Sequence, residues 1–169
     1  MPFNLRVFIS STFSDLEEYR QAAFVAIQSL GAHGDDMIYW SADERSGTQH
    51  SVERIKQCDV VILLLAHRYG YVAEGESFSV TEMEYLVARN ANIPILAFFL
   101  DESQPWPPDR IQWERIEQLK AFKQRVETEV TRKLFRSTDE LGRLVTQALA
   151  MFMERQRARA EGSRRFGFA

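Results

Sequence analysis

Short, strongly apolar segments alternate along this chain with segments of helical spacing, and this alternation limits the fold more than any other feature. The apolar segments are rich in β-branched and aromatic residues, as strands are. They lie at residues 5–10, 37–40, 60–66 and 95–100, with a weaker one at residues 133–136. Strands that alternate with helices form a parallel sheet covered on both faces, so we expect an α/β fold.

The segments between the strands have apolar residues at steps of three and four, as amphipathic helices do. They predict helices over residues 15–30, 51–57, 79–90, 110–131 and 138–159. Ser14 or Asp15 should cap the first helix, and Gly31 or Gly34 should end it. With right-handed crossovers, this order predicts a flavodoxin-like three-layer sandwich whose five-stranded parallel sheet has the order 2-1-3-4-5.

The 169 residues suffice for one ordinary domain, and no internal repeat occurs. We expect an α/β domain over residues 1–158 and a basic tail or linker over residues 159–169. The chain has 21 basic and 24 acidic residues, and this balance offers no general attraction for nucleic acid or an anionic membrane. The chain has a single cysteine and no pattern of a secretory signal, and its apolar runs are far shorter than the ~20 residues of a membrane span. We therefore expect a cytoplasmic protein.

The candidate site follows from the topology, because sheets of this order bind ligands at the carboxyl ends of strands 1 and 3. The three histidines are too scattered to predict a metal site, and there is no G-x-G-x-x-G, Walker or G-x-S-x-G motif. The loop at residues 10–14 offers hydroxyls and N–H groups that suit a phosphate or ribose, although turn chemistry alone also explains them. Residues 41–48 form a polar recognition loop or a solvated surface loop.

Two further features lie after the third predicted strand. Arg68 and Tyr69 could stack a base or nicotinamide, or could instead be a buried tyrosine beside a paired arginine. Ser79 and Glu82 match the capping box S-x-x-E at a helix start. Glu84 has no such local role, and we expect it at an exposed first-turn position, as a complement to the helix dipole or as a functional carboxylate.

Several motifs in fixed order resemble the domain-of-unknown-function 4062 family. They are RVFISSTFSDL at residues 6–16, DVV at 59–61, RYG at 68–70 and SVTEMEY at 79–85. The resemblance runs from Leu5 to about Asp101. This family is similar to Toll/interleukin-receptor-like (TIR-like) domains and often begins multidomain proteins with NTPase or repeat modules. The resemblance therefore implies a self-associating domain, fused to or bound by such modules, in immune or stress signalling and antiphage defence.

TIR-like enzymes and nucleoside deoxyribosyltransferases share a glutamate on the helix before strand 4, with alanine four residues later and an apolar strand start about eleven later. Glu84, Ala88 and Ile95 match this register, and Glu82 matches it less well. The resemblance thus implies that Glu84 is catalytic, with Glu82 as second choice. Such a carboxylate binds the ribose hydroxyls of NAD and stabilises the oxocarbenium-like state as nicotinamide leaves.

NAD or a related nucleotide is then the substrate, and no cofactor is implied. The residues expected to contact it are Ser10, Ser11, Thr12, Phe13, Arg45, Arg68, Tyr69 and Phe78. Two alternatives remain, since a fold does not determine a function. One is a non-enzymatic adaptor module that assembles with its own copies, and the other is a nucleoside or nucleotide N-glycosyl hydrolase or transferase that uses the same glutamate.

Overall fold

The computed structural model describes residues 4–35 and 47–166, and in them five strands form one parallel sheet. The strands are β1 (Arg6–Ser10), β2 (His33–Asp35), β3 (Val60–Leu65), β4 (Ile95–Leu100) and β5 (Arg132–Phe135). Their order is β2-β1-β3-β4-β5, which confirms the prediction. All four pairings are parallel, with Val7 beside Val60 and Val61 beside Ile95.

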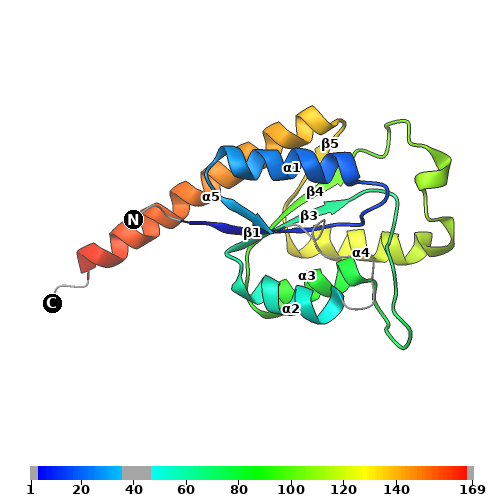
Figure 1. Cartoon of the computed structure of the whole chain (residues 1–169), viewed down its shortest axis with the longest axis horizontal. Coiled ribbons are helices and arrows are strands. Elements are labelled where there is room, and N and C mark those ends of the chain that lie inside the picture. The colour runs from blue at the N-terminus through cyan, green and yellow to red at the C-terminus, as the bar shows by residue number, and fades with distance from the viewer. Residues whose placement is uncertain (1–3, 36–46, 167–169) are drawn as a thin grey trace.

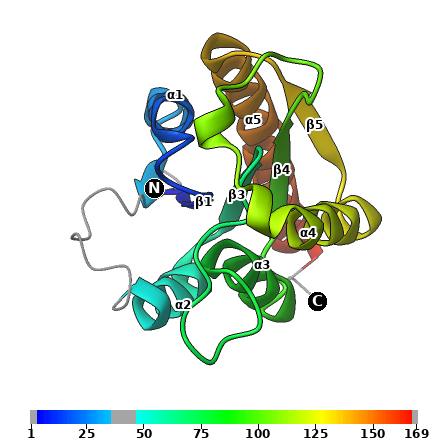
Figure 2. The ribbon, with the colours of Figure 1, turned by 90° about the vertical axis from the view of Figure 1, so that its right-hand side faces the viewer.

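Helices cover both faces of the sheet, as Figures 1 and 2 show. They are α1 (Glu17–Ser29), α2 (Gly47–Gln57), α3 (Val80–Asn90), α4 (Ile116–Glu129) and α5 (Thr138–Phe166). Helices α1 and α5 pack together on one face, and α2, α3 and α4 lie on the other. The 3₁₀ turns η2 (Pro108–Arg110) and η3 (Trp113–Arg115) come before α4, which therefore begins later than predicted.

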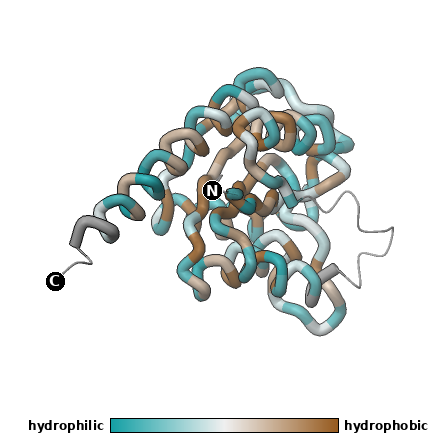
Figure 3. The backbone as a smooth tube through the Cα atoms, turned by 60° about the vertical axis from the view of Figure 1, so that its left-hand side comes forward, coloured by the Kyte–Doolittle hydropathy of each residue, from teal (hydrophilic) through white to brown (hydrophobic). Residues whose placement is uncertain are grey.

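The central strand β3 serves both halves of the core. Its six residues are all buried and apolar. Ile62 and Leu64 pack toward α1 and α5, whereas Val61 and Leu63 pack toward α2, α3 and α4. Successive side chains of a strand point to opposite faces, so a strand inside a covered sheet must be apolar throughout. Figure 3 shows the same distribution, with apolar residues concentrated in the interior.

The start of α1 differs from the prediction of a Ser14 or Asp15 cap, which is wrong. The cap position is Leu16, which has no side-chain hydrogen bond, and its N–H donates to the Phe13 carbonyl oxygen at 3.1 Å. Asp15 instead accepts a hydrogen bond from the Thr12 hydroxyl at 2.6 Å, within the loop. A short turn therefore replaces the cap.

Of the two glycines predicted as possible ends of α1, only one follows the helix directly. Gly31 follows the helix with a φ of 71°, in the left-handed region that glycine favours, so this stop is confirmed. Gly34 lies inside β2 and does not end the helix. The strand predicted at residues 37–40 lies outside the described residues. Strand β2 comes before it, and its short, partly exposed sequence has none of the apolar character by which strands are predicted.

Helix α5 extends well past its predicted end at Arg159, to Phe166. Its last part projects beyond the body of the domain and is mostly hydrophilic in Figure 3. Within the described ranges, no helix is both long and apolar enough to cross a bilayer. The boundary of the domain near residue 158 stays a prediction.

Candidate functional site

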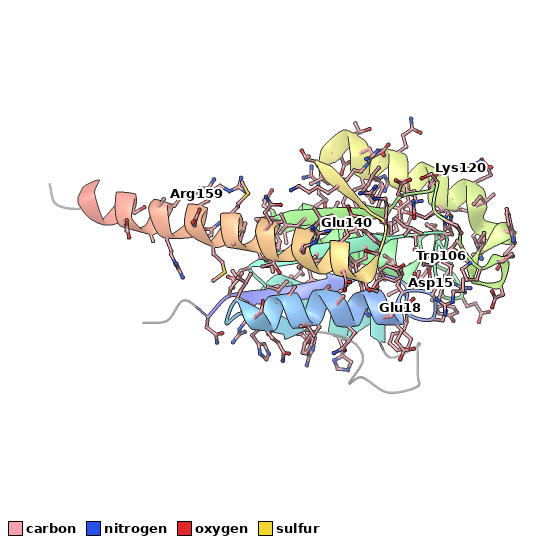
Figure 4. All side chains as sticks on the ribbon, turned by 90° about the horizontal axis from the view of Figure 1, so that it is seen from above. Asp15, Glu18, Trp106, Lys120, Glu140 and Arg159 are labelled. Atoms are coloured by element: carbon pink, nitrogen blue, oxygen red, sulfur yellow. The ribbon has the colours of Figure 1, made fainter. Side chains whose placement is uncertain are left out.

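The loops that follow β1, β3 and β4 meet at the carboxyl edge of the sheet and interlock. Gln112, in the loop after β4, accepts a hydrogen bond from Gly70 N–H at 2.9 Å through its side-chain oxygen. Its own N–H donates to the His67 carbonyl oxygen at 3.1 Å. Asp15 and Trp106, from the loops after β1 and β4, lie at the same end of the molecule in Figure 4. The edge is thus tied together by loops distant in sequence.

Gly70 is required where these loops touch. Its φ is 102°, and a Cβ there would lie 3.2 Å from Thr12 Cγ2 in the loop after β1. An L-residue with such a backbone carries strain of roughly 1–3 kcal/mol. The RYG motif therefore ends in glycine because the loops after β1 and β3 pack closely here.

We expect Gly70→Ala to lower the free energy of unfolding by about 1–3 kcal/mol, measured by urea denaturation. Gly75→Ala is the matched control, since Gly75 has a φ of 81° but no heavy atom lies within 4 Å of the position that its Cβ would take. Both variants carry backbone strain, and Gly70→Ala adds the contact with Thr12. Equal losses in the two variants would mean that the contact between the loops contributes nothing.

Glu84 lies at this edge, in the second turn of α3, since Glu82 is the acidic residue of the first turn. It is 4% exposed, so the expectation of an exposed position is wrong. The face of α3 that carries Glu84, Tyr85 and Ala88 is buried. Glu84 Oε2 accepts a hydrogen bond from the Ser10 hydroxyl at 2.5 Å, which joins the end of β1 to the start of α3. Oε1 is also buried, with no hydrogen-bond partner in the described part of the chain.

The ionisation of Glu84 reflects this burial. Removal from water raises the pKa of the carboxyl group from 4.5 to about 7. The hydrogen bond from Ser10, the positive charge of Arg20 and the hydroxyl of Ser51 all favour the anion and oppose the effect of burial in part. A carboxyl group that titrates near neutral pH, at the ligand-binding edge of such a sheet, is a candidate for acid–base or electrostatic chemistry.

Glu82 is also buried, but both of its carboxylate oxygens are occupied. Oε2 accepts a hydrogen bond from the Tyr69 hydroxyl at 2.5 Å, and Oε1 pairs with Nη1 of Arg125 at 3.1 Å. Ser79 Oγ accepts from the Glu82 N–H at 3.2 Å, so the predicted N-cap is confirmed. The other half of the capping box is wrong, because Ser79 N–H donates to the Tyr69 hydroxyl oxygen at 3.2 Å. These bonds give Glu82 a structural role.

Side chains at the end of β1 and in the loop that follows it contact two charged residues, Glu84 and Arg20. Ser10 bonds Glu84, whereas the Ser11 hydroxyl accepts from Arg20 Nη1 at 2.6 Å and donates to the Thr12 carbonyl oxygen at 2.7 Å. Phe13 is 47% exposed, and its ring centroid lies 5.9 Å from Arg20 Cζ. Arg20 thus anchors the loop through its hydrogen bond to Ser11, while the Phe13 ring is partly exposed to solvent.

The sequence matches a known protein family over most of its length. The model of the domain of unknown function DUF4062 matches residues 6–150, most of the chain. The chain belongs to this family. Comparison of the DUF4062 domain with curated protein sequences gives no significant match.

Solved structures show how the DUF4062 domain is folded. It is similar to a TIR domain in the crystal structure of the RPS4 and RRS1 TIR domain heterodimer, with a TM-score of 0.54, 14% identity, and 88% of this chain and 97% of that chain covered. It is also similar to BcmB, a CMP N-glycosidase of Clostridium botulinum, with a TM-score of 0.49, 16% identity, and coverage of 82% and 97%. A flavodoxin-like domain from Synechococcus sp. matches at a TM-score of 0.43 and 13% identity, with coverage of 88% and 99%. The match to the TIR domain, together with the sheet order β2-β1-β3-β4-β5, shows that the DUF4062 domain has a TIR-like, flavodoxin-like fold.

The remaining predicted contact residues that the structure describes have partners other than Glu84. Tyr69 is buried and bonded to Glu82, and Phe78 is 39% exposed with its ring centroid 5.5 Å from the Cζ atom of Arg125. Arg68 acts on the loop after β1, since its charge favours the anionic form of Asp15. Arg45 lies outside the described residues. Only Ser10 among the predicted contacts has a described hydrogen bond to Glu84.

Sequence reasoning missed three polar residues of this site. Arg20, Ser51 and Asp15 are all buried. Arg20 shares a helix face with Leu16 and Ala23, so an arginine within an apolar stripe was the available indication. Burial raises the pKa of Asp15, and the Thr12 hydroxyl lowers it in part. No group of three or more His, Cys, Asp or Glu side chains within residues 4–35 and 47–166 could hold a metal ion.

Proposed function

We propose that this DUF4062 domain is a TIR-like effector that hydrolyses the N-glycosidic bond of NAD, with Glu84 as the catalytic carboxylate. The observation that carries the proposal is the state of that carboxylate. It is buried at the carboxyl edge of β1, held through one oxygen by Ser10, and its second oxygen has no described partner. A preorganised, desolvated anion is the group that stabilises a developing cation best.

The chemistry requires little more than this charge. As the bond between the ribose C1′ and the nicotinamide nitrogen breaks, its electron pair leaves with nicotinamide, which becomes neutral. The ribose becomes an oxocarbenium ion, and anionic Glu84 stabilises it. Water then adds to C1′ and loses a proton, giving ADP-ribose. A carboxylate whose pKa is about 7 is suited to accept that proton near neutral pH.

The direct test is to incubate the concentrated protein with NAD and to separate the products by chromatography. Equal amounts of nicotinamide and ADP-ribose are expected. If NAD stays intact while nucleosides or other nucleotides lose their bases, the protein is an N-glycosyl hydrolase or transferase of another specificity. If none of these compounds reacts and the protein still assembles, it is an adaptor module.

We also propose that activity depends on self-association. Glu84 is 4% exposed in the isolated chain, so a nucleotide reaches it only after the surrounding loops rearrange, and contacts between copies can favour such a rearrangement. The RPS4 and RRS1 TIR domains, which share this fold, form a heterodimer.

Specific activity should therefore rise with protein concentration and level off as the protein assembles. The measurement is the initial rate of nicotinamide release per mole of protein, taken alongside the mass by light scattering. Equal specific activity at all concentrations, with monomers throughout, would contradict the dependence on assembly.

A further inference from the structure

Arg20 is a buried cation beside the candidate carboxylate. It lies near the start of α1 and is 2% exposed, although arginine is rarely buried. Nη1 donates to the Ser11 hydroxyl at 2.6 Å and approaches the Ser11 carbonyl oxygen at 3.4 Å. A guanidinium group stays protonated in a protein, so this charge is permanent, and it is costly to bury without compensation nearby.

Two adjacent serines connect this cation with Glu84. Ser10 donates to the carboxylate, and Ser11, the next residue, accepts from Arg20. The positive charge of Arg20 favours the anionic form of Glu84. Among the described residues, the other groups that act on this carboxyl are neutral hydroxyls, those of Ser10 on β1 and Ser51 on α2. The charge balance of the site thus depends on Arg20.

We propose that Arg20 is the positioning residue of the Glu84 site: it holds the Ser10–Ser11 dipeptide in place through Ser11 and supplies a positive charge that favours the anionic form of the carboxyl group. Arg20 acts on the reaction through Glu84. Its consequence for turnover rests on the proposed function, whereas its effect on the ionisation of Glu84 does not.

The test measures that ionisation without any nucleotide. The full chain is labelled with ¹³C at glutamate carboxyl carbons, and the Glu84 resonance is identified by its loss in Glu84→Gln. It is then titrated in the wild type, Arg20→Met and Arg20→Lys. An opposite charge within several ångströms lowers a carboxyl pKa by about 1–3 units, so Arg20→Met should raise the midpoint by about one unit or more. Arg20→Lys, which keeps the charge, should stay within about half a unit of the wild type.

A folded Arg20→Met with an unchanged midpoint overturns the proposal, and so does Arg20→Lys if its midpoint moves as far as that of Arg20→Met. If Arg20→Met does not fold, the double variant Arg20→Met/Glu84→Gln decides, because it removes both buried charges. Recovery of folding in the double variant supports the charge pairing. A double variant that stays unfolded reduces Arg20 to a packing residue and overturns it.

Turnover gives a second readout that a packing role would not produce. In Arg20→Met the rising limb of the pH–rate profile for nicotinamide release should move to higher pH by the same amount as the titration, and Arg20→Lys should restore it. A rising limb that stays at its wild-type pH would overturn the link to catalysis. A wild-type protein that does not cleave NAD would defeat the proposed function, and the titration would still decide the role of Arg20.

Discussion

Glu84→Gln should lower the rate of NAD cleavage by about a hundredfold or more, equivalent to about 3 kcal/mol of transition-state stabilisation. Glutamine keeps the shape of the side chain and can still accept the hydrogen bond from Ser10. It lacks the negative charge that, in the proposed reaction, stabilises the oxocarbenium-like state. The rate should be measured as nicotinamide release above about pH 8, where the wild-type carboxyl group, with its pKa of about 7, is ionised.

Glu82→Gln is the matched control, because it makes the same change at a second buried glutamate of α3, two residues away and with different partners. Glutamine can still accept the hydrogen bond from Tyr69, but the ion pair with Arg125 is lost. We expect a loss of about 1–2 kcal/mol in unfolding free energy, and wild-type activity per folded molecule. Unchanged activity in Glu84→Gln would refute the catalytic assignment. Loss of activity in Glu82→Gln alone would mean that Glu82, and not Glu84, is the catalytic carboxylate.

Stability should respond to Glu84→Gln in the opposite sense to activity. The pKa of Glu84 is about 7 in the fold, above its ordinary value of 4.5, so the folded protein binds this proton more tightly than the unfolded chain. The stabilisation is complete below about pH 4.5 and is lost as the pH rises through about 7. Between about pH 5.5 and 8.5 the wild type should therefore lose about 2 kcal/mol that the glutamine variant keeps.

Urea denaturation of the two proteins at both pH values measures this difference. The loss of stability toward high pH should persist in Glu82→Gln, which leaves the Glu84 carboxyl in place. Parallel pH dependences in the wild type and Glu84→Gln would show that Glu84 carries no burial penalty. Together the two experiments test whether a group that destabilises the fold at working pH is the group that performs the chemistry.

Most of the sheet could be predicted because the apolar residues that mark a buried strand are consecutive in the sequence. Strand β3 must be apolar at every position to serve two layers, and residues 60–66 show this directly. Strand β2 escaped prediction because an edge strand of three partly exposed residues has no such requirement. The sheet order followed from the chain order and the handedness of crossovers, and neither depends on side-chain detail.

The site could be predicted only in outline, because its properties depend on packing. The topology brings Ser10 and Glu84 to one edge, as expected, but the burial of Glu84 depends on how α3 rotates against the sheet. Similarly, S-x-x-E indicated a capping box, and Tyr69 from another loop displaced half of it. Arg20 was overlooked because a buried arginine is rare, so helical spacing gave it little weight.

The hydrogen bond between Ser10 and Glu84 links residues 74 positions apart. Strand β1 pairs in the sheet with β2 and with β3, and β3 begins only at Val60. During synthesis, β1 can therefore be enclosed in the sheet only after β3 has been made. Glu84 can reach Ser10 only later, when α3 has formed. Before α3 packs against the end of β1, we expect Glu84 to lie in water with an ordinary acidity. With the proposed chemistry, the reactive carboxylate thus forms only when β1 and α3 have packed together, so a chain too short to contain both would consume no NAD.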